Sequence, residues 1–379
     1  MKAVLFANTD WYLWNFRLPL ARALRERGWE VVLVSPPGDY APRLREAGFR
    51  WEGFAFSRRG INPLAEALTL ARLARLYRDL APDLAHHFTI KCVLYGGLAA
   101  ERAGVRSVVS SVTGLGHLFT SGGATSAMLR PVVGLAYRRV LSRSEVVFQN
   151  PDDREHFAAS GVLREHEGVH LIRGSGVHTE RFRPADPAPP EPPVTIVLVA
   201  RLLREKGVAE FVEAARALAA HGVAARFVVA GDIDPGNPSS HSAADVEAWR
   251  RDSPVEFLGH HEDMPGLWRS AHIACLPSWR EGTPRSLLEA GASGLALVAT
   301  DVPGCREVVR NGDNGLLVPA RDPAALAAAL EALARDGARR LAMGRRSREI
   351  VAGGFSESHV IDRTLAVYEA ALARKTPGK

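Results

Sequence analysis

Two series of short apolar runs, each run followed by an amphipathic helical pattern, constrain the fold of this chain more than any other feature. The first series begins at Lys2–Ala7, and the second begins at Val194–Ala200. Such alternation is typical of parallel sheets built from βαβ units. Between the series lies Arg183–Pro193, whose repeated prolines cannot form a helix or an interior strand. The sequence therefore predicts two α/β domains joined by a stiff linker.

The predicted domain boundaries follow from these patterns. Residues 1–175 form an N-terminal Rossmann-like domain, 176–193 the linker and 194–356 a C-terminal Rossmann-like domain, and 357–375 contains a last helix. Two such domains facing each other form a cleft at the carboxyl ends of both sheets. Ligands of α/β proteins usually bind there.

Composition narrows the class of protein. The chain has 379 residues, of which 46% are hydrophobic, enough for two cores. Cys92, Cys275 and Cys305 lie far apart without metal-ligand spacing, so we expect buried, reduced thiols and a cytoplasmic protein. The apolar runs are shorter than the roughly 18 to 20 residues that span a bilayer. The first residues are typical of a β-strand and not of a signal peptide.

The positive charge lies in the N-terminal half. Residues 1–175 carry 23 Lys and Arg against 16 Asp and Glu, whereas the remainder carries 25 against 26. Two interpretations stay open: scattered solvated arginines, or attraction to anionic lipid headgroups or to a pyrophosphate-bearing acceptor. Nucleic acid is not expected, because the arginines are dispersed and no recognition motif accompanies them.

Glu281 and Glu289 flank a segment that favours the start of a helix. Thr283 is the expected N-cap and Pro284 the first helical residue. The first amides of that helix then face an anion at its positive end. These amides belong to Arg285, Ser286 and Leu287. The arrangement suits a diphosphate at the helix start, a sugar beside the first carboxylate and a ribose diol beside the second, although two solvated surface glutamates are the plain alternative.

Arg201 and Lys206 directly follow the first strand of the second domain, at the end expected to face the cleft. Arg201 offers a planar fork of donors and Lys206 a mobile point charge, a combination suited to a diphosphate leaving group. A basic surface turn is the alternative interpretation.

The segment Leu276–Ala290 resembles the Glu-x7-Glu motif of the retaining glycosyltransferases of family 4, in the GT-B class. It is most similar to the capsular-polysaccharide (CapM-like) branch. The resemblance covers nearly the whole chain and is strongest over 194–320, where Asp301–Glu307 and Asn311–Pro319 also match. It implies a GT-B fold, with two Rossmann-like domains facing across a cleft and the C-terminal helix crossing back to the N-terminal domain.

The resemblance also implies roles for individual residues. Arg201 and Lys206 would bind the donor pyrophosphate, and Glu281 would hold the donor sugar and its developing positive charge. These three are the expected catalytic residues. The remaining expected donor contacts are Glu289, which would hold the ribose, and Gly231, Asp232, Leu258, Gly259, Gly282, Arg285, Ser286 and Leu287.

The N-terminal domain departs from the family pattern at two places. Asn8–Trp11 lacks the Gly-Gly loop of many relatives, and Val112–Gly114 stands where many carry a His-Asp pair. The candidates for contact with the acceptor or the transferred sugar are His117, Arg17 and Lys91. An apolar group within 118–133, interleaved with arginines, is interpreted either as core or as a membrane-docking face.

These observations predict a retaining, metal-independent glycosyltransferase without a cofactor. The expected donor is a UDP-sugar, implied by the capsular branch to be a UDP-N-acetylhexosamine, and the expected acceptor is an undecaprenyl-diphosphate-linked saccharide for capsule or O-antigen assembly. We expect the protein in the cytoplasm, with peripheral contact at the inner face of the membrane left open. The alternatives are a UDP-sugar 2-epimerase on the same scaffold and a non-catalytic nucleotide-sugar binder. An NAD enzyme is not expected, because no Gly-x-Gly-x-x-Gly follows the first strand of either domain.

Overall fold

A computed structural model describes residues 1–57, 62–113, 124–164 and 168–374, with only the backbone described at Pro63 and over 124–132. The chain divides into two compact units. The first comprises Met1–Ser175 and the C-terminal residues from Val360, and the second comprises Gly176–His359. The expected linker, 176–193, thus belongs to the second unit. The cleft expected between the two domains stays a prediction.

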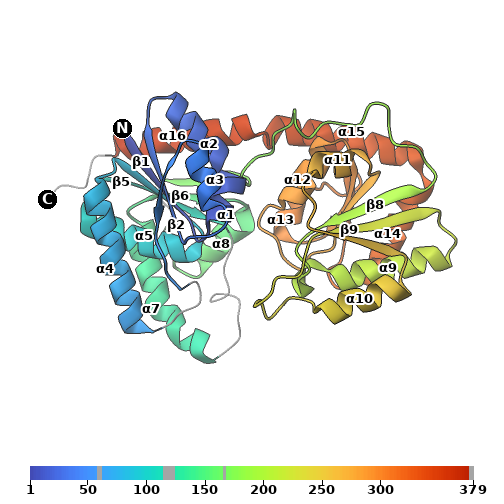
Figure 1. Ribbon diagram of the computed structural model, residues 1–379, viewed down its shortest axis with the longest axis horizontal. Helices are drawn as coiled ribbons and strands as arrows, with labels where there is room; N and C mark the ends of the chain where they lie inside the picture. The colour runs from blue at the N-terminus through green and yellow to red at the C-terminus, as the bar shows by residue number, and fades with distance from the viewer. Residues whose placement is uncertain (58–61, 114–123, 165–167, 375–379) are drawn as a thin grey trace. The chain divides into compact units, whose positions relative to one another are not determined.

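The first unit contains a seven-stranded parallel sheet (Figure 1). Its strands lie in the order β3-β2-β1-β4-β5-β6-β7, so the chain reverses direction across the sheet between β1 and β4. Sheets of this order bind ligands at the carboxyl ends of their strands. The strands are β1 (Lys2–Phe6), β2 (Glu30–Ser35), β3 (Arg50–Gly53), β4 (Leu84–Phe88), β5 (Ser107–Val112), β6 (Glu145–Phe148) and β7 (Val169–Leu171).

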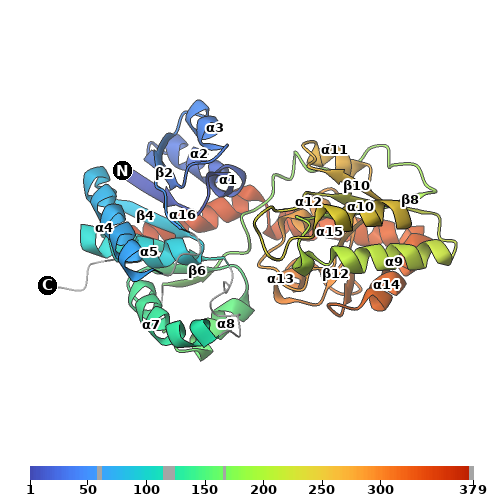
Figure 2. The ribbon, with the colours of Figure 1, turned by 60° about the horizontal axis from the view of Figure 1, so that its bottom comes forward.

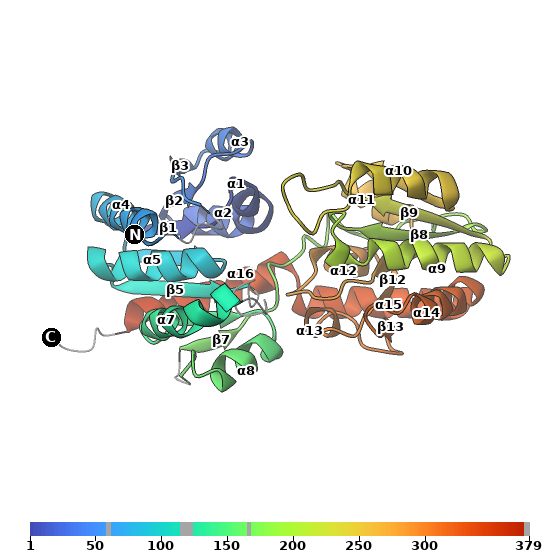
Figure 3. The same cartoon turned by 90° about the horizontal axis from the view of Figure 1, so that it is seen from below.

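Helices cover both faces of this sheet because alternate strand residues point to opposite sides. Leu5 and Leu33 pack with residues of α2 and α16, whereas Val4 and Val32 pack with residues of α4 and α5. Figure 3 shows α5 between α4 and α7, and Figure 2 shows α7 beside α8, where the Tyr137 ring meets a phenylalanine of α8. The helical segments are α1 (Asp10–Tyr12), the π-helical turn η1 (Leu13–Arg17), α2 (Leu18–Glu26), α3 (Ala41–Glu46), α4 (Pro63–Leu80), α5 (Ile90–Ala103), α7 (Ala124–Leu141) and α8 (Pro151–Ala159).

The second unit repeats the architecture with a six-stranded parallel sheet in the order β10-β9-β8-β11-β12-β13. Ile196 and Leu198 pack against α9 and α14, which lie side by side in Figures 1 and 2, and Val197 packs against α12 and α15. The strands are β8 (Val194–Val199), β9 (Ala225–Ala230), β10 (Val255–Gly259), β11 (Ile273–Leu276), β12 (Ala296–Thr300) and β13 (Gly315–Val318). The helical segments are the 3₁₀ turn η2 (Arg204–Lys206), α9 (Val208–Ala220), α10 (Ala243–Asp252), α11 (Met264–Arg269), α12 (Arg285–Ala292), α13 (Pro303–Arg306), α14 (Pro323–Arg335) and α15 (Gly337–Gly354).

The last helix, α16 (Glu357–Ala373), starts in the second unit and continues into the first. Its residues Val360, Leu365 and Tyr368 are buried in the core of the first unit, against α2 and the sheet. The predicted return of the C-terminal helix to the N-terminal domain is therefore confirmed. Cys92, Cys275 and Cys305 are free and buried, as expected. Among the described residues, no helix is both long and apolar enough to cross a membrane.

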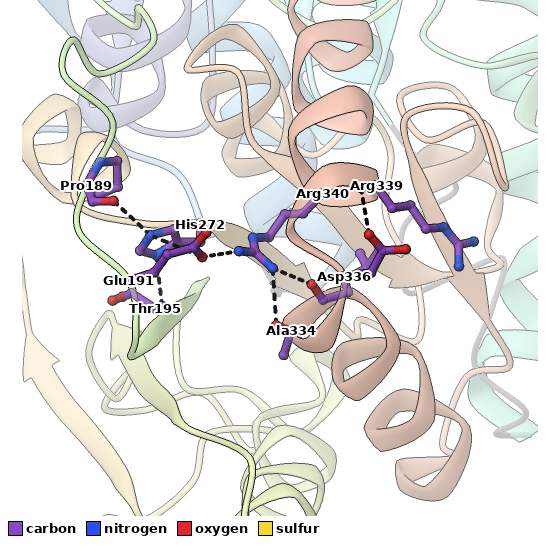
Figure 4. Close-up of polar contacts among 9 residues, drawn as sticks. Pro189, Glu191, Thr195, His272, Ala334, Asp336, Arg339 and Arg340 are labelled. Carbon is purple, nitrogen blue, oxygen red and sulfur yellow. Dashed lines mark hydrogen bonds and ion pairs between the residues drawn. The ribbon is translucent and has the colours of Figure 1, made fainter.

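Polar contacts tie the proline-rich segment to the second unit (Figure 4). Glu191 forms an ion pair with the buried guanidinium of Arg340 on α15. His272 Nδ1 accepts a hydrogen bond from the Thr195 amide at 3.0 Å, and its Nε2 lies 3.3 Å from the carbonyl oxygen of Pro189. These contacts explain why a segment that forms neither helix nor strand stays with this unit.

One helical region differs from the sequence expectation. The pattern predicts a single helix over 16–27, whereas helical structure begins at Asp10 and passes through the π-helical turn η1 before α2. The Thr9 side chain caps α1 by accepting a hydrogen bond from the Tyr12 amide at 3.1 Å. The aromatic run Trp11–Phe16 has weak helix propensity, so this early start depends on capping and packing that periodicity does not reveal.

Candidate active site

The carboxyl ends of β8, β9 and β10 bring three of the predicted segments together. The Leu202 amide donates to the Asp232 carbonyl and the Gly231 amide to the Gly259 carbonyl, each at 2.8 Å. Gly231 has a φ of +144°, and a Cβ there would lie 1.9 Å from the carbonyl oxygen of Ala200. Only glycine fits this position, so the predicted Gly231 is required by the close approach of two strand ends.

Lys206 and Glu281, both predicted as catalytic, meet in the structure. The Lys206 Nζ atom lies 2.5 Å from Glu281 Oε1, and their side chains are 21% and 11% exposed. The two residues come from different loops, after β8 and after β11. At the carboxyl edge of the sheet, the ammonium of this pair can bind a negatively charged group of a ligand, and the carboxylate can bind a positively charged or hydrogen-bond-donating group.

Trp279 holds these two loops against each other, a role that the sequence analysis missed. Its amide donates to the Glu205 carbonyl at 2.8 Å, and its indole Nε1 donates to Glu210 Oε1 at 2.7 Å. The guanidinium of Arg321 lies 4.1 Å from the Trp279 ring centre. A Cβ at Gly207 would lie 2.1 Å from the Pro277 carbonyl oxygen, so the loops touch through their backbones as well.

The helix that follows Glu281 begins one residue later than predicted. Pro284 is the N-cap, with extended backbone angles, and α12 starts at Arg285. The prediction of Thr283 as N-cap was wrong, and the Pro284 side chain at that position makes no capping hydrogen bond. The first bond within α12 joins the Leu288 amide to the Pro284 carbonyl. The amides of Ser286 and Leu287 therefore have no acceptor inside the helix and suit an anion.

Glu289 lies in the first turns of α12 and is 8% exposed. Its Oε1 atom accepts a hydrogen bond from Arg285 Nε at 2.8 Å, and its Oε2 atom lies 3.4 Å from the indole nitrogen of the buried Trp268. The carboxylate is thus held in one orientation. Trp268 is a second residue that sequence reasoning missed, because its contact depends on how α11 packs on α12.

Arg201 lies immediately after β8 and is paired with a carboxylate that the sequence analysis overlooked. Its Nη1 atom lies 2.6 Å from Asp234 Oδ2, and the Arg201 side chain is 62% exposed. The segment Asp232-Ile233-Asp234 is an Asp-x-Asp sequence, a pattern that often binds metal-bound diphosphates. In this structure the second of the two aspartates, Asp234, forms the ion pair with Arg201. Groups of three or more His, Cys, Asp or Glu arranged to hold a metal are absent from the described residues.

The segment after β12 supports the Glu281 loop from the side. A Cβ at Gly304 would lie 2.0 Å from the Gly282 carbonyl oxygen. Burial raises the pKa of the neighbouring Cys305 thiol, and the charge of Glu281 raises it further. Cys305 is thus an inert packing residue close to Glu281. In the sequence, Asp301–Glu307 contributes only to the family resemblance, whereas in the structure Gly304 packs against the backbone of the Glu281 loop.

The candidates of the N-terminal domain have different surroundings. Lys91 is partly buried and its Nζ atom contacts Glu66 Oε1 at 2.9 Å and the Ser57 carbonyl at 2.6 Å. Arg17 is buried beside Phe88 at the end of β4. His117 lies outside the described residues, as do most side chains of the apolar group within 118–133.

Comparison with protein families relates both units of the chain to glycosyltransferases. Residues 2–150 match the family described as "Glycosyl transferase 4-like", and residues 193–336 match "Glycosyl transferases group 1". One similar structure is HepE from Anabaena, solved with UDP and glucose, which has a TM-score of 0.78 and 18% identity and covers 98% of this chain and 100% of its own. Sucrose-phosphate synthase from Thermosynechococcus elongatus has a TM-score of 0.77 and 19% identity, with 98% and 99% coverage.

Two sequence relatives match over nearly their whole length. An N,N'-diacetylbacillosaminyl-diphospho-undecaprenol α-1,3-N-acetylgalactosaminyltransferase of Campylobacter jejuni is 28% identical over 95% of this chain and 96% of its own. The capsular polysaccharide biosynthesis glycosyltransferase CapM of Staphylococcus aureus is 22% identical, with 96% coverage of each chain.

Fold, site and family matches together define a glycosyltransferase with the GT-B fold. Within that class, the chain belongs to glycosyltransferase family 4, and one of its relatives is named as an enzyme of capsular polysaccharide biosynthesis. The 2-epimerase alternative is not favoured, because the sequence relatives described above are named as transferases.

Proposed function

We propose that this glycosyltransferase transfers a sugar from UDP to a lipid-diphosphate-linked saccharide, with retention of configuration and without a metal ion. The observation that carries the proposal is the Lys206–Glu281 pair at 2.5 Å, held beside the start of α12 by the Trp279 contacts. One loop thus supplies a cation for a leaving phosphate and the other a carboxylate for the sugar.

In the proposed reaction, Lys206, Arg201 and the first amides of α12 bind the diphosphate of the donor. The bond between the anomeric carbon and the β-phosphate oxygen breaks, and the negative charge on departing UDP is stabilised by these cations and amides. Glu281 stabilises the positive charge that develops on the sugar ring. The acceptor hydroxyl forms the new bond on the same face, and its proton passes to an oxygen of the leaving phosphate. Glu289 holds the ribose of the nucleotide.

Metal independence rests on the charges that surround the leaving group. Arg201 and Lys206 supply two positive charges, and the N-terminus of α12 supplies a partial one. Asp234, which could otherwise favour a cation, forms an ion pair with Arg201 at 2.6 Å. The positive groups together suit a diphosphate that lacks its usual Mg²⁺ or Mn²⁺.

The identities of the substrates are proposed from the relatives. The Campylobacter jejuni relative is named as a transferase of N-acetylgalactosamine onto a diphospho-undecaprenol-linked sugar, and an Escherichia coli relative, 24% identical over 82% of this chain, as a galactosyltransferase acting on GlcNAc-diphosphoundecaprenol. We infer a UDP-N-acetylhexosamine donor and a polyprenyl-diphosphate-linked saccharide acceptor. An enzyme that uses such an acceptor acts at the cytoplasmic face of a membrane.

The test is transfer by purified protein from a panel of UDP-sugars to undecaprenyl-diphosphate-linked saccharides, in EDTA, with products followed by mass. A glycolipid heavier by one sugar, formed with release of UDP, supports the proposal and names the donor. NMR of the product gives the anomeric configuration. Turnover that appears only after Mn²⁺ is added would refute metal independence.

The epimerase alternative is tested in the same assay by leaving the acceptor out. Conversion of one UDP-sugar into its C2 epimer would replace the transferase proposal. Binding of UDP-sugars without any turnover, with every acceptor of the panel, would favour the non-catalytic binder.

A further inference from the structure

Arg17 occupies an unusual position in the backbone of the first unit. It is the last residue of the π-helical turn Leu13–Arg17, directly before α2 begins at Leu18. Its own backbone leaves the helical region, with φ of −124° and ψ of −8°. π-Helical turns are rare and frequently occur at functional sites, where they direct a side chain that a regular helix would place elsewhere.

The Arg17 side chain is buried against aromatic rings. The residue is only 5% exposed, and its guanidinium carbon lies 4.3 Å from the ring centre of Phe88 and 5.3 Å from that of Tyr12. Its Nη2 atom donates to the Tyr12 hydroxyl at 2.7 Å, whereas its buried Nε has no acceptor among the residues that the structure describes. Phe88 is the last residue of β4, so the guanidinium lies at the carboxyl edge of the sheet.

No aspartate or glutamate of the described residues forms an ion pair with Arg17. The buried carboxylate nearest to Arg17 in the sequence belongs to Asp10. It accepts hydrogen bonds from the backbone amides of Tyr40 and Ala41, at 2.8 and 2.9 Å. A charge removed from water without an opposite charge is costly. Arg17 therefore carries a positive charge that the described part of the first unit does not balance.

The described rings and hydroxyl that contact this guanidinium are neutral, and so is the neighbouring His86 near pH 7. His86 on β4 is hydrogen-bonded through one ring nitrogen to the Tyr368 hydroxyl and through the other to the Ser111 hydroxyl, both at 2.7 Å. Burial lowers the pKa of His86 well below its usual value, and the charge of Arg17 lowers it further. Thr89, which follows Phe88, has a φ of +71°, a strained conformation for a β-branched residue and one typical of functional sites.

We propose that Arg17 is an anion-binding residue of the first unit and that it contacts a phosphate of the acceptor diphosphate. The choice of ligand rests on the proposed function, whereas the need for an anion rests on the uncompensated charge itself. The aromatic rings of Phe88 and Tyr12 hold the guanidinium in place, and the phosphate supplies the missing negative charge.

Thermal unfolding separates this role from a structural one. All samples contain saturating UDP, so that the donor site is filled, and inorganic pyrophosphate is the probe. Arg17→Met replaces the charge by an apolar chain of similar length, and Arg25→Met is the matched control, because Arg25 also lies over a phenylalanine ring, at 4.5 Å from Phe49, but is exposed. A binding role predicts that Arg17→Met has a melting temperature equal to or above wild type and loses the rise that pyrophosphate gives to wild type and to Arg25→Met.

The opposite result overturns the proposal. If Arg17→Met melts several degrees below wild type and pyrophosphate stabilises it as much as it stabilises wild type, Arg17 is a packing residue. Arg17→Lys keeps the charge but not the planar fork, and a binding role predicts that it retains part of the pyrophosphate effect.

Kinetics identify the source of the phosphate. With the diphosphate-linked acceptor, Arg17→Met should raise the KM for the acceptor about 10- to 100-fold and leave the KM for the UDP-sugar unchanged. An unchanged acceptor KM together with a lost pyrophosphate effect would show a site for free phosphate and refute the acceptor assignment. Failure of the proposed function itself appears differently, as absence of transfer by wild type, while the pyrophosphate experiment still tests Arg17.

Discussion

The charged residues of the candidate site in the second unit and the buried Arg17 of the first unit have different electrostatic surroundings. In the second unit, six charged residues of the candidate site form three pairs of opposite charge: Lys206 with Glu281, Arg201 with Asp234 and Arg285 with Glu289. In the first unit the buried Arg17 has aromatic rings and a hydroxyl around it, and none of the described carboxylates pairs with it.

This difference has a physical consequence. Paired charges hold one another in place, so the donor site is preorganised before a ligand arrives, and a ligand exchanges one partner for another. An unpaired buried charge costs stability until an anion binds, and binding then recovers that cost. The ion pairs of the second unit thus fix the geometry of the donor site before a ligand binds. The unpaired charge of Arg17 in the first unit instead favours the binding of an anion.

The largest expected effect tests the paired site. Glu281→Gln removes the carboxylate while keeping its shape, and kcat/KM should fall about 10³-fold, because a positioned charge aimed at the transition state is lost. Steady-state kinetics with varied UDP-sugar and saturating acceptor measure this kcat/KM. Glu256→Gln breaks the exposed Arg226 ion pair and should leave activity unchanged. A fall of less than 10-fold for Glu281→Gln would make the Lys206 pair structural and remove the contrast between the units.

A second prediction concerns the backbone of the paired site. Gly231→Ala places a methyl group where it would meet the Ala200 carbonyl oxygen and strains a φ of +144°, so the free energy of unfolding should fall by about 3 kcal/mol. UDP affinity, measured by calorimetry, should fall with it. Gly222→Ala is the control, because its φ is also positive but nothing lies within 4 Å. Equal losses in the two variants would contradict the importance of close approach at the strand ends.

Acid should destabilise the first unit before the second. His86 and His87 are fully buried in the first unit, and burial lowers the pKa of His87 to about 3. The pKa of a histidine in the unfolded chain is near 6.5. At a pH between that value and the lower pKa of the folded state, the unfolded chain binds protons that the folded chain does not. Stability therefore falls as the pH falls, by about 1.4 kcal/mol per pH unit for each such histidine.

Hydrogen exchange followed by mass spectrometry from pH 7 to 5 measures the loss of stability of each unit separately. The pKa values of His241 and His272 in the second unit are also lowered by burial, but these histidines are less deeply buried. His87→Phe should reduce the acid sensitivity of the first unit. Earlier acid opening of the second unit would reverse the expected order.

The smallest expected effect concerns positioning. Trp279→Phe keeps a ring under Arg321 but loses the indole hydrogen bond to Glu210, so kcat should fall about 5- to 10-fold with the UDP-sugar KM nearly unchanged. Trp51→Phe, which removes an indole hydrogen bond to Ser35 in the first unit, is the control. A loss in KM and not in kcat would assign Trp279 to donor binding instead of loop positioning.

Much of the fold could be predicted from sequence because its signals are local. Apolar runs and helical periodicity predicted both parallel sheets, and the helices Val208–Ala220 and Pro323–Arg335 lie where the pattern indicates. Two short elements were not predicted. The π-helical turn before α2 and the four-residue helix Pro303–Arg306 have too few residues to show a period.

The sequence also indicated the main site residues, since Arg201, Lys206, Glu281 and Glu289 stand in recognisable segments. It did not indicate which of them pair. Lys206 and Glu281 are 75 residues apart, and Trp279 and Glu210 are 69 apart. Such partners meet only when loops from different strands reach the same edge of the sheet.

The sequence by itself determined the two α/β units, the family and the segments that carry the charged residues, because periodicity and short motifs are properties of neighbouring residues. The tertiary structure alone decided which charged residues of the second unit's site pair with one another, and that Arg17 is buried without an ion pair to any carboxylate of the described residues. Burial and pairing depend on which side chains the packed sheets and helices bring within a few ångströms. That choice is made across the whole fold and leaves no local pattern.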